Sequence, residues 1–129
     1  MIDKPNIRLF YASCFALITT AFSFSIRAGI LPELGKTFDL TATQLGFINS
    51  MFFFGFPISM VLGGIFYSTL GPKRIMIIAF ITHTIGIVTT IFANGYTGLL
   101  ISTIFIGLGN GCTEAACNPM IATSYSGKQ

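Results

Sequence analysis

Two long stretches of this chain hold no charged residue, and this limits the folds open to it. No Lys, Arg, Asp or Glu occurs between Leu40 and Pro72 or between Ile75 and Thr113. Charged residues make up 9% of the chain, whereas a soluble domain carries roughly 25%. Because a soluble protein covers its surface with polar groups, the pattern instead predicts membrane-spanning helices of about 20 apolar residues each.

Four spans account for the apolar runs. The turn dipeptide at Asn94 and Gly95 divides the longer uncharged stretch into two spans. Strands of a membrane barrel would alternate apolar with polar residues, and the run Met51–Phe54 does not alternate. We therefore expect an all-α membrane protein, one incomplete helix bundle over residues 1–129, whose transmembrane helices cover residues 9–34, 44–70, 75–92 and 99–122.

The basic residues predict how these spans are oriented, because short cytoplasmic loops carry an excess of Lys and Arg. With four spans, both termini and the second loop lie on one side of the membrane. That side holds Lys4, Arg8, Lys73, Arg74 and Lys128, whereas the other side holds Lys36. We expect a multi-pass protein of the cell (inner) membrane with both termini in the cytoplasm. The basic residues form no stripe interleaved with aromatic side chains, so no nucleic-acid partner is expected.

Two charged residues fall deep inside predicted spans, Arg27 in the first and Glu114 in the fourth. Such residues are costly in a bilayer and normally face the bundle interior or a wet cavity. Asn110, Glu114 and Asn118 are spaced i, i+4 and i+8, so they form one stripe on a helix. This stripe and Arg27 predict a polar cavity that binds a small polar solute.

Other readings of these polar residues remain open. The stripes can join helices through hydrogen bonds, and Arg27 can extend to the membrane interface as an anchor. Arg27 and Glu114 are expected to lie about 14 Å apart along the membrane normal, at a rise of about 1.5 Å per residue. We therefore expect them to flank a midplane site, where transporters hold their solutes, and not to form an ion pair.

The two residues are expected to differ in their roles. A carboxyl group in a medium of low dielectric constant favours its protonated form, so Glu114 is the expected proton carrier. Arg27 stays charged at any working pH, so it can attract anions or donate hydrogen bonds but cannot carry the proton.

The remaining reactive side chains predict no cofactor, no metal site and no enzyme. The cysteines match no zinc spacing and are expected to be small packing residues; they are Cys14, Cys112 and Cys117. His83 is expected to make a helix–helix hydrogen bond, with a proton relay as the alternative. No nucleophile–base pair stands at a predicted membrane face.

The second predicted span and its loop resemble the major facilitator superfamily. The run from Gly64 to Arg74 lies where that family has the end of its second helix and its Gly-rich basic loop. Gly64, Gly71 and Lys73 match the family pattern, whereas Ser68 stands where the family usually has Asp. The resemblance implies a conformational loop formed by Gly64, Gly71, Lys73 and Arg74.

The fourth span resembles the fucose–proton symporter branch of the same superfamily. The run from Gly107 to Pro119 has a Gly-rich segment followed by Glu, two small residues and then Asn-Pro. The resemblance implies a sugar solute and proton coupling, with the family's glutamate falling on Glu114. In the first span the family's Asp position falls on Ala28, beside Arg27. This departure leaves room for an acidic sugar or another polar solute.

The resemblance also implies a larger assembly. The superfamily has twelve helices in two halves, so the four spans are expected to be its first third, an N-terminal fragment of a proton-coupled sugar transporter. Its expected partners are a small polar solute, protons, the lipid bilayer and the missing remainder of the transporter. The alternative is a complete four-helix membrane protein that acts as an oligomeric efflux unit or an accessory subunit.

Overall fold

The computed structural model describes residues 7–125, and over this range it consists of four helices without a strand. They are α1 (Ile7–Thr37), α2 (Ala42–Ile65), α3 (Tyr67–Ile91) and α4 (Tyr96–Tyr125). Each helix is long and apolar enough to cross a membrane. The predicted fold class, an all-α protein with four transmembrane helices, is therefore confirmed. Lys4 and Lys128, which enter the orientation prediction, lie outside the described residues.

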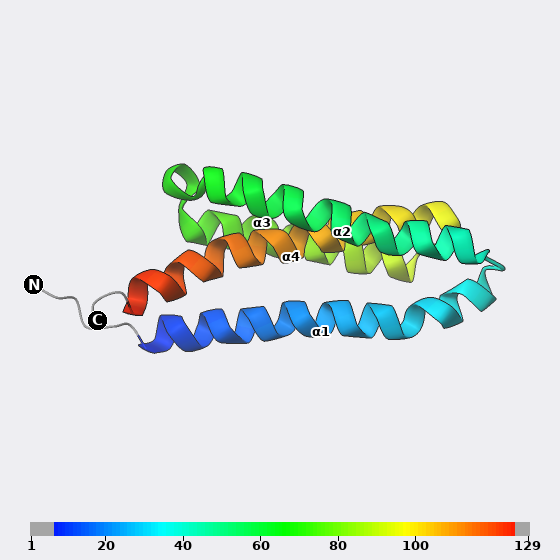
Figure 1. Cartoon of the computed structure of the whole chain (residues 1–129), viewed down its shortest axis with the longest axis horizontal. Helices are drawn as coiled ribbons and strands as arrows, with labels where there is room; N and C mark the ends of the chain where they lie inside the picture. Colours follow the sequence, from blue (N-terminus) through cyan, green and yellow to red (C-terminus); the bar gives the residue numbers. More distant parts are fainter. Residues whose placement is uncertain (1–6, 126–129) are drawn as a thin grey trace, which may run out of the picture.

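The helices run up and down in one elongated bundle (Figure 1). The start of α1, the end of α4 and the α2–α3 connection lie at one end of the bundle. The α1–α2 and α3–α4 connections lie at the opposite end. This alternation is what four consecutive membrane crossings require.

Helix α4 is the centre of the bundle. Of the most apolar stretch of α4, 61% is buried, whereas the share in each of the other helices is 22% or less. It packs mainly against α2 and α3 and more sparsely against α1. Many large apolar side chains of α1, α2 and α3 stay exposed on the outside of the bundle, as expected of surfaces that face lipid.

Small residues bring α2 and α4 into backbone contact. A Cβ atom added to Gly107 of α4 would lie 2.7 Å from the carbonyl oxygen of Phe52. On the facing helix, a Cβ atom added to Gly55 would lie 2.8 Å from the carbonyl oxygen of Ile104. Glycine at both positions allows the close approach on which helix association in a bilayer depends.

The boundaries of α2 differ from the predicted second span, residues 44–70. Helix α2 begins at Ala42 because Thr41 and Gln44 form a capping box, in which the backbone N–H of Gln44 donates to Thr41 Oγ1 at 3.3 Å. At the other end α2 stops at Ile65, and α3 is interrupted at Gly71, whose φ of 74° and ψ of 160° are not helical. Pro72 then opens the long part of α3, a position where proline is well tolerated.

Replacing Gly107 with Ala is expected to lower the free energy of unfolding by about 1–3 kcal/mol, because the two helices must move apart to admit the methyl group. Denaturant titration in detergent micelles, followed by helix content, measures the change. Gly46→Ala is the matched control, because nothing lies within 4 Å of a Cβ atom at Gly46. Equal stability of both variants would contradict the close α2–α4 contact.

Candidate functional site

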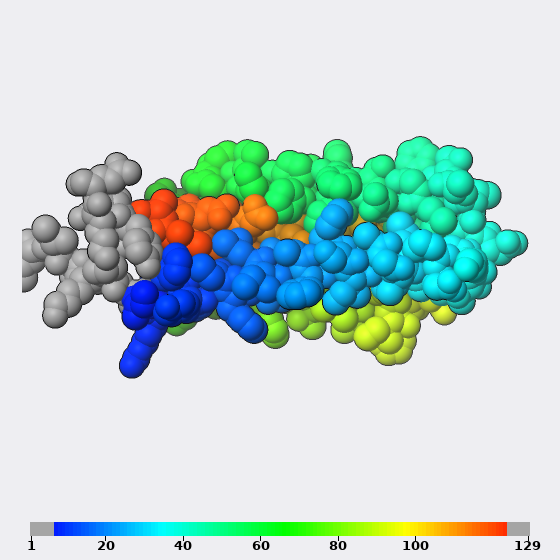
Figure 2. Space-filling model, turned by 60° about the horizontal axis from the view of Figure 1, so that its bottom comes forward, coloured from blue at the N-terminus to red at the C-terminus, as the bar shows by residue number. Residues whose placement is uncertain are grey.

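A cavity of about 480 Å³ opens between α1, α2 and α4. In the space-filling view α4 lies at the bottom of the groove between α1 and α2 (Figure 2). The cavity gathers three of the four predicted binding residues, Asn110, Glu114 and Asn118. Its remaining lining residues come from α1 and α2: Leu17, Thr20, Ala21, Phe24, Phe52, Phe53 and Phe56. A mostly apolar wall with a few polar groups is typical of a small-molecule site.

The polar stripe of α4 is graded in exposure along the helix. Asn110 is buried, Glu114 is half-buried and Asn118 is exposed. The stripe therefore leads from the interior of the bundle toward the end that holds the start of α1 and the end of α4. Within residues 7–125, the one ion pair is between Lys36 and Glu33 at 2.8 Å. The Glu114 carboxyl group therefore faces the cavity without a cationic partner in this range.

Aromatic rings form the opposite wall of the cavity. The rings of Phe52 and Phe56 are stacked with their centroids 6.0 Å apart, and the Phe24 ring lies 5.0 Å from that of Phe52. These rings come from α1 and α2, whereas the amide and carboxyl groups come from α4. The cavity therefore combines amide and carboxyl groups of α4 with aromatic faces of α1 and α2.

Arg27, the fourth predicted binding residue, does not line this cavity. Arg27 is 7% exposed. Its side chain reaches from α1 to the part of α3 and α4 next to the connection between these two helices. The guanidinium group donates to the Leu99 carbonyl oxygen at 3.1 Å and to Ser102 Oγ at 3.2 Å. It also donates to Thr103 Oγ1 and, at 3.4 Å, to Thr90 Oγ1. Arg27 thus ties α1 to α3 and α4 through neutral oxygen atoms.

Sequence reasoning missed the partners of Arg27. The signal was a set of small polar residues in otherwise apolar runs, Thr90 before the turn at Asn94 and Ser102 and Thr103 after it. The expectation that Arg27 and Glu114 do not form an ion pair agrees with the described part of the chain.

Sequence reasoning also missed how Asn110 is held. Its Oδ1 atom lies 2.5 Å from Nε2 of His83 on α3, and its Nδ2 atom donates to the carbonyl oxygen of Thr20 on α1 at 3.3 Å. The expected helix–helix hydrogen bond of His83 is therefore present. One buried amide connects three helices at the inner end of the polar stripe.

The predicted conformational loop is only partly a loop. Gly71 has a positive φ in a region that is nearly restricted to glycine. Lys73 and Arg74, in contrast, are exposed in the first turn of the helix that Pro72 opens. Gly64 is exposed in the last turn of α2, and nothing lies within 4 Å of a Cβ atom there.

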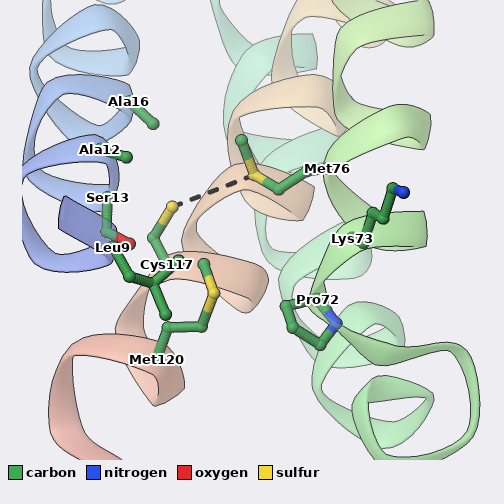
Figure 3. Close-up of a pocket in the computed structure, with 9 residues that line it drawn as sticks. All are labelled: Leu9, Ala12, Ser13, Ala16, Pro72, Lys73, Met76, Cys117 and Met120. Carbon is green, nitrogen blue, oxygen red and sulfur yellow. Dashed lines mark hydrogen bonds between the residues drawn. The ribbon is translucent and has the colours of Figure 1, made fainter. Parts of the chain in front are cut away.

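A second cavity, of about 330 Å³, lies beside this loop between α1, α3 and α4 (Figure 3). Cys117 donates its thiol hydrogen to Met76 Sδ at 4.0 Å across this cavity, and the Lys73 side chain points away from the two sulfur atoms. The wall is almost wholly apolar. No group of three or more His, Cys, Asp or Glu side chains is placed to hold a metal ion anywhere in residues 7–125.

Comparison with known proteins adds independent information. The sequence model of the family described as Major Facilitator Superfamily matches residues 13–129. The hexuronate transporter of Bacillus subtilis (strain 168) is 32% identical over 90 residues, 70% of this chain and 21% of that protein. The L-fucose-proton symporter of Escherichia coli (strain K12) is 30% identical over 124 residues, 92% of this chain and 28% of that protein.

A third similar protein is the probable anion transporter 1, chloroplastic, of Oryza sativa subsp. japonica. It is 29% identical over 113 residues, 84% of this chain and 21% of that protein. The chain thus spans 21–28% of the length of these relatives. No solved structure gives a significant match.

Replacing Arg27 with Lys is expected to lower the free energy of unfolding by about 1–3 kcal/mol. The ammonium group keeps the charge but lacks the planar fork that reaches several acceptors at once. Denaturant titration in micelles measures the loss. Arg8→Lys, the same substitution at an exposed position of α1, is the control. If both variants were as stable as the parent chain, Arg27 would not tie the helices together.

Proposed function

Since this chain belongs to the major facilitator superfamily, we propose that it forms the first part of a proton-coupled transporter for a small acidic sugar. The three similar proteins described above are named as transporters or symporters, and the chain is a multi-pass membrane protein. The single observation that carries the proposal is the cavity in which Glu114, Asn110 and Asn118 face a wall of aromatic rings.

The chemistry of this cavity suits a sugar. Amide and carboxyl groups can donate hydrogen bonds to hydroxyl groups or accept them. Aromatic side chains offer large apolar faces against which the ring of a sugar can pack. The L-fucose-proton symporter of Escherichia coli, named for a neutral sugar, aligns over 92% of the chain.

The buried cation favours an acidic solute over a neutral one. Arg27 is 7% exposed, and within residues 7–125 its guanidinium group donates to neutral oxygens. A buried charge without a counter-charge is costly, so an anion that enters the bundle would be attracted toward the Arg27 end. We propose that Arg27 contributes to solute binding through this charge. The hexuronate transporter and the probable anion transporter among the relatives are named for anions.

Glu114 is the proposed proton-coupling residue. Its carboxyl group lines the cavity half-buried and lacks a cationic partner in residues 7–125. Protonation of this carboxyl group would remove a negative charge from the site at the moment when an anionic solute binds. The solute and the proton would therefore stabilise each other's binding, which is the basis of coupling.

Two further elements complete the proposal. Alternating access requires a second bundle that moves against this one, so the remainder of such a transporter is the proposed partner of the chain. The exposed residues Arg8, Lys73 and Arg74 lie at the end of the bundle with the α2–α3 connection. By the excess of basic residues in cytoplasmic loops, this end is proposed to face the cytoplasm of a cell whose inner membrane holds the protein.

Uptake into vesicles that hold a full-length transporter carrying this segment tests the proposal. An inward proton gradient is expected to drive accumulation of labelled hexuronate. Glu114→Gln is expected to abolish accumulation and leave some exchange, because the amide cannot release a proton. Glu33→Gln, at an exposed carboxylate outside the cavity, is expected to behave like the parent protein.

The same vesicles separate the solute classes. Accumulation of labelled L-fucose without any hexuronate uptake would contradict an acidic solute. Unchanged accumulation in Glu114→Gln would contradict the assignment of the coupling residue.

A further inference from the structure

Both ring nitrogens of His83 face oxygen atoms that accept hydrogen bonds. Nδ1 lies 3.1 Å from the carbonyl oxygen of Ala79, and Nε2 lies 2.5 Å from Oδ1 of Asn110. A neutral imidazole carries one N–H, whereas the protonated imidazolium carries two. Only the protonated ring can therefore donate both of these hydrogen bonds.

The orientation of the Asn110 amide is set from the other side. Its Nδ2 atom donates to the carbonyl oxygen of Thr20 at 3.3 Å, and the residue is 2% exposed. If the amide were turned round, its oxygen would face the Thr20 carbonyl oxygen, and two acceptors would oppose each other. The oxygen of the amide therefore points at His83, and it requires a hydrogen on Nε2.

The packing of α3 against α4 keeps the His83 ring in this position. A Cβ atom added to Gly109 of α4 would lie 2.8 Å from Cγ of the ring. The ring thus lies flush with the α4 backbone at Gly109. His83 has little room to leave its two acceptors unless the helices separate.

The charged surroundings of His83 are sparse. It lines a cavity of about 360 Å³ between α1, α3 and α4, and it is the one titratable residue among the described lining residues. From α4, the nearest titratable group along the same stripe is Glu114, which opens to the other cavity. On α1, Arg27 lines neither the His83 cavity nor the Glu114 cavity, and its guanidinium group donates to the Leu99 carbonyl oxygen. No residue of α2 lines this cavity.

We propose that His83 is a second proton-binding site, separated from Glu114 by the buried Asn110 amide. In its protonated form it donates to Ala79 and Asn110 and completes the link from α3 through α4 to α1. Thr20, which accepts from Asn110, lines both the His83 cavity and the Glu114 cavity. The proton site stands on the hydrogen-bond geometry alone, whereas its use in coupling rests on the proposed function.

Loss of the proton leaves one of the two acceptors facing a nitrogen lone pair. The protonated ring lies on one side of the Asn110 amide, and the Glu114 carboxyl group lies one helical turn further along the same stripe of α4. This places a reversible positive charge next to the solute cavity.

Nitrogen NMR of the 129-residue chain in lipid nanodiscs tests the site. The chain contains one His, so selective ¹⁵N-histidine labelling reports on His83 alone. Two protonated ring nitrogens are expected at about pH 5.5, and reversible loss of one of these hydrogens is expected at about pH 8. A His that serves only as a neutral interhelical hydrogen-bonding group would show one N–H at both pH values and would overturn the proposal.

One variant that removes a partner of the ring, together with a matched control, extends this test. Asn110→Leu removes the oxygen that faces Nε2 and is expected to abolish the second N–H signal at about pH 5.5. Thr84→Val is the matched control, because Thr84 lines the same cavity but bonds to Phe80 of its own helix. Loss of the signal in the control as well would refute the role of Asn110. Because the measurement needs no solute, its outcome is independent of the transport experiment.

Discussion

The central constraint on this structure is that polar groups inside a bilayer need partners within the protein. Helix α4 supplies many of these partners, because most of the hydrogen bonds between helices involve a residue of α4. Arg27 of α1 donates to Leu99, Ser102 and Thr103, and the Asn110 amide joins Thr20 to His83. Around these bonds, glycines such as Gly107 allow α2 to pack backbone to backbone with α4. The result is one central helix that holds the other three.

These contacts divide the helices into two classes. Helices α2 and α3 hold α4 through extensive close packing, whereas α1 touches it more sparsely. The polar links from α1 to α4 include those of Arg27 and of the Thr20 carbonyl group.

The sequence predicted the four helices because long uncharged runs admit few alternatives. The spacing of Glu114, Asn110 and Asn118 fixes them on one face of one helix, and all three line one cavity in the structure; that they bind a solute stays a prediction. Sequence reasoning placed Gly71 between two spans, but it did not predict that α2 ends at Ile65 and α3 begins at Tyr67, because the apolar run from residue 44 to residue 70 looks like one continuing helix. It did not find the partners of Arg27 or the bond between His83 and Asn110. Those depend on the rotation of one helix against another, which spacing along a single helix does not determine.

The central claim is that the cavity between α1, α2 and α4 binds the solute. It can be tested by solute protection in a full-length transporter that carries this segment, with Cys14, Cys112 and Cys117 replaced by Ser. Saturating hexuronate is expected to slow the reaction of a thiol reagent with the variant Asn118→Cys, whose position lines the cavity. It should leave unchanged the reaction with Ser68→Cys, whose exposed position lies outside the cavity. Equal labelling rates of Asn118→Cys with and without hexuronate would contradict the account.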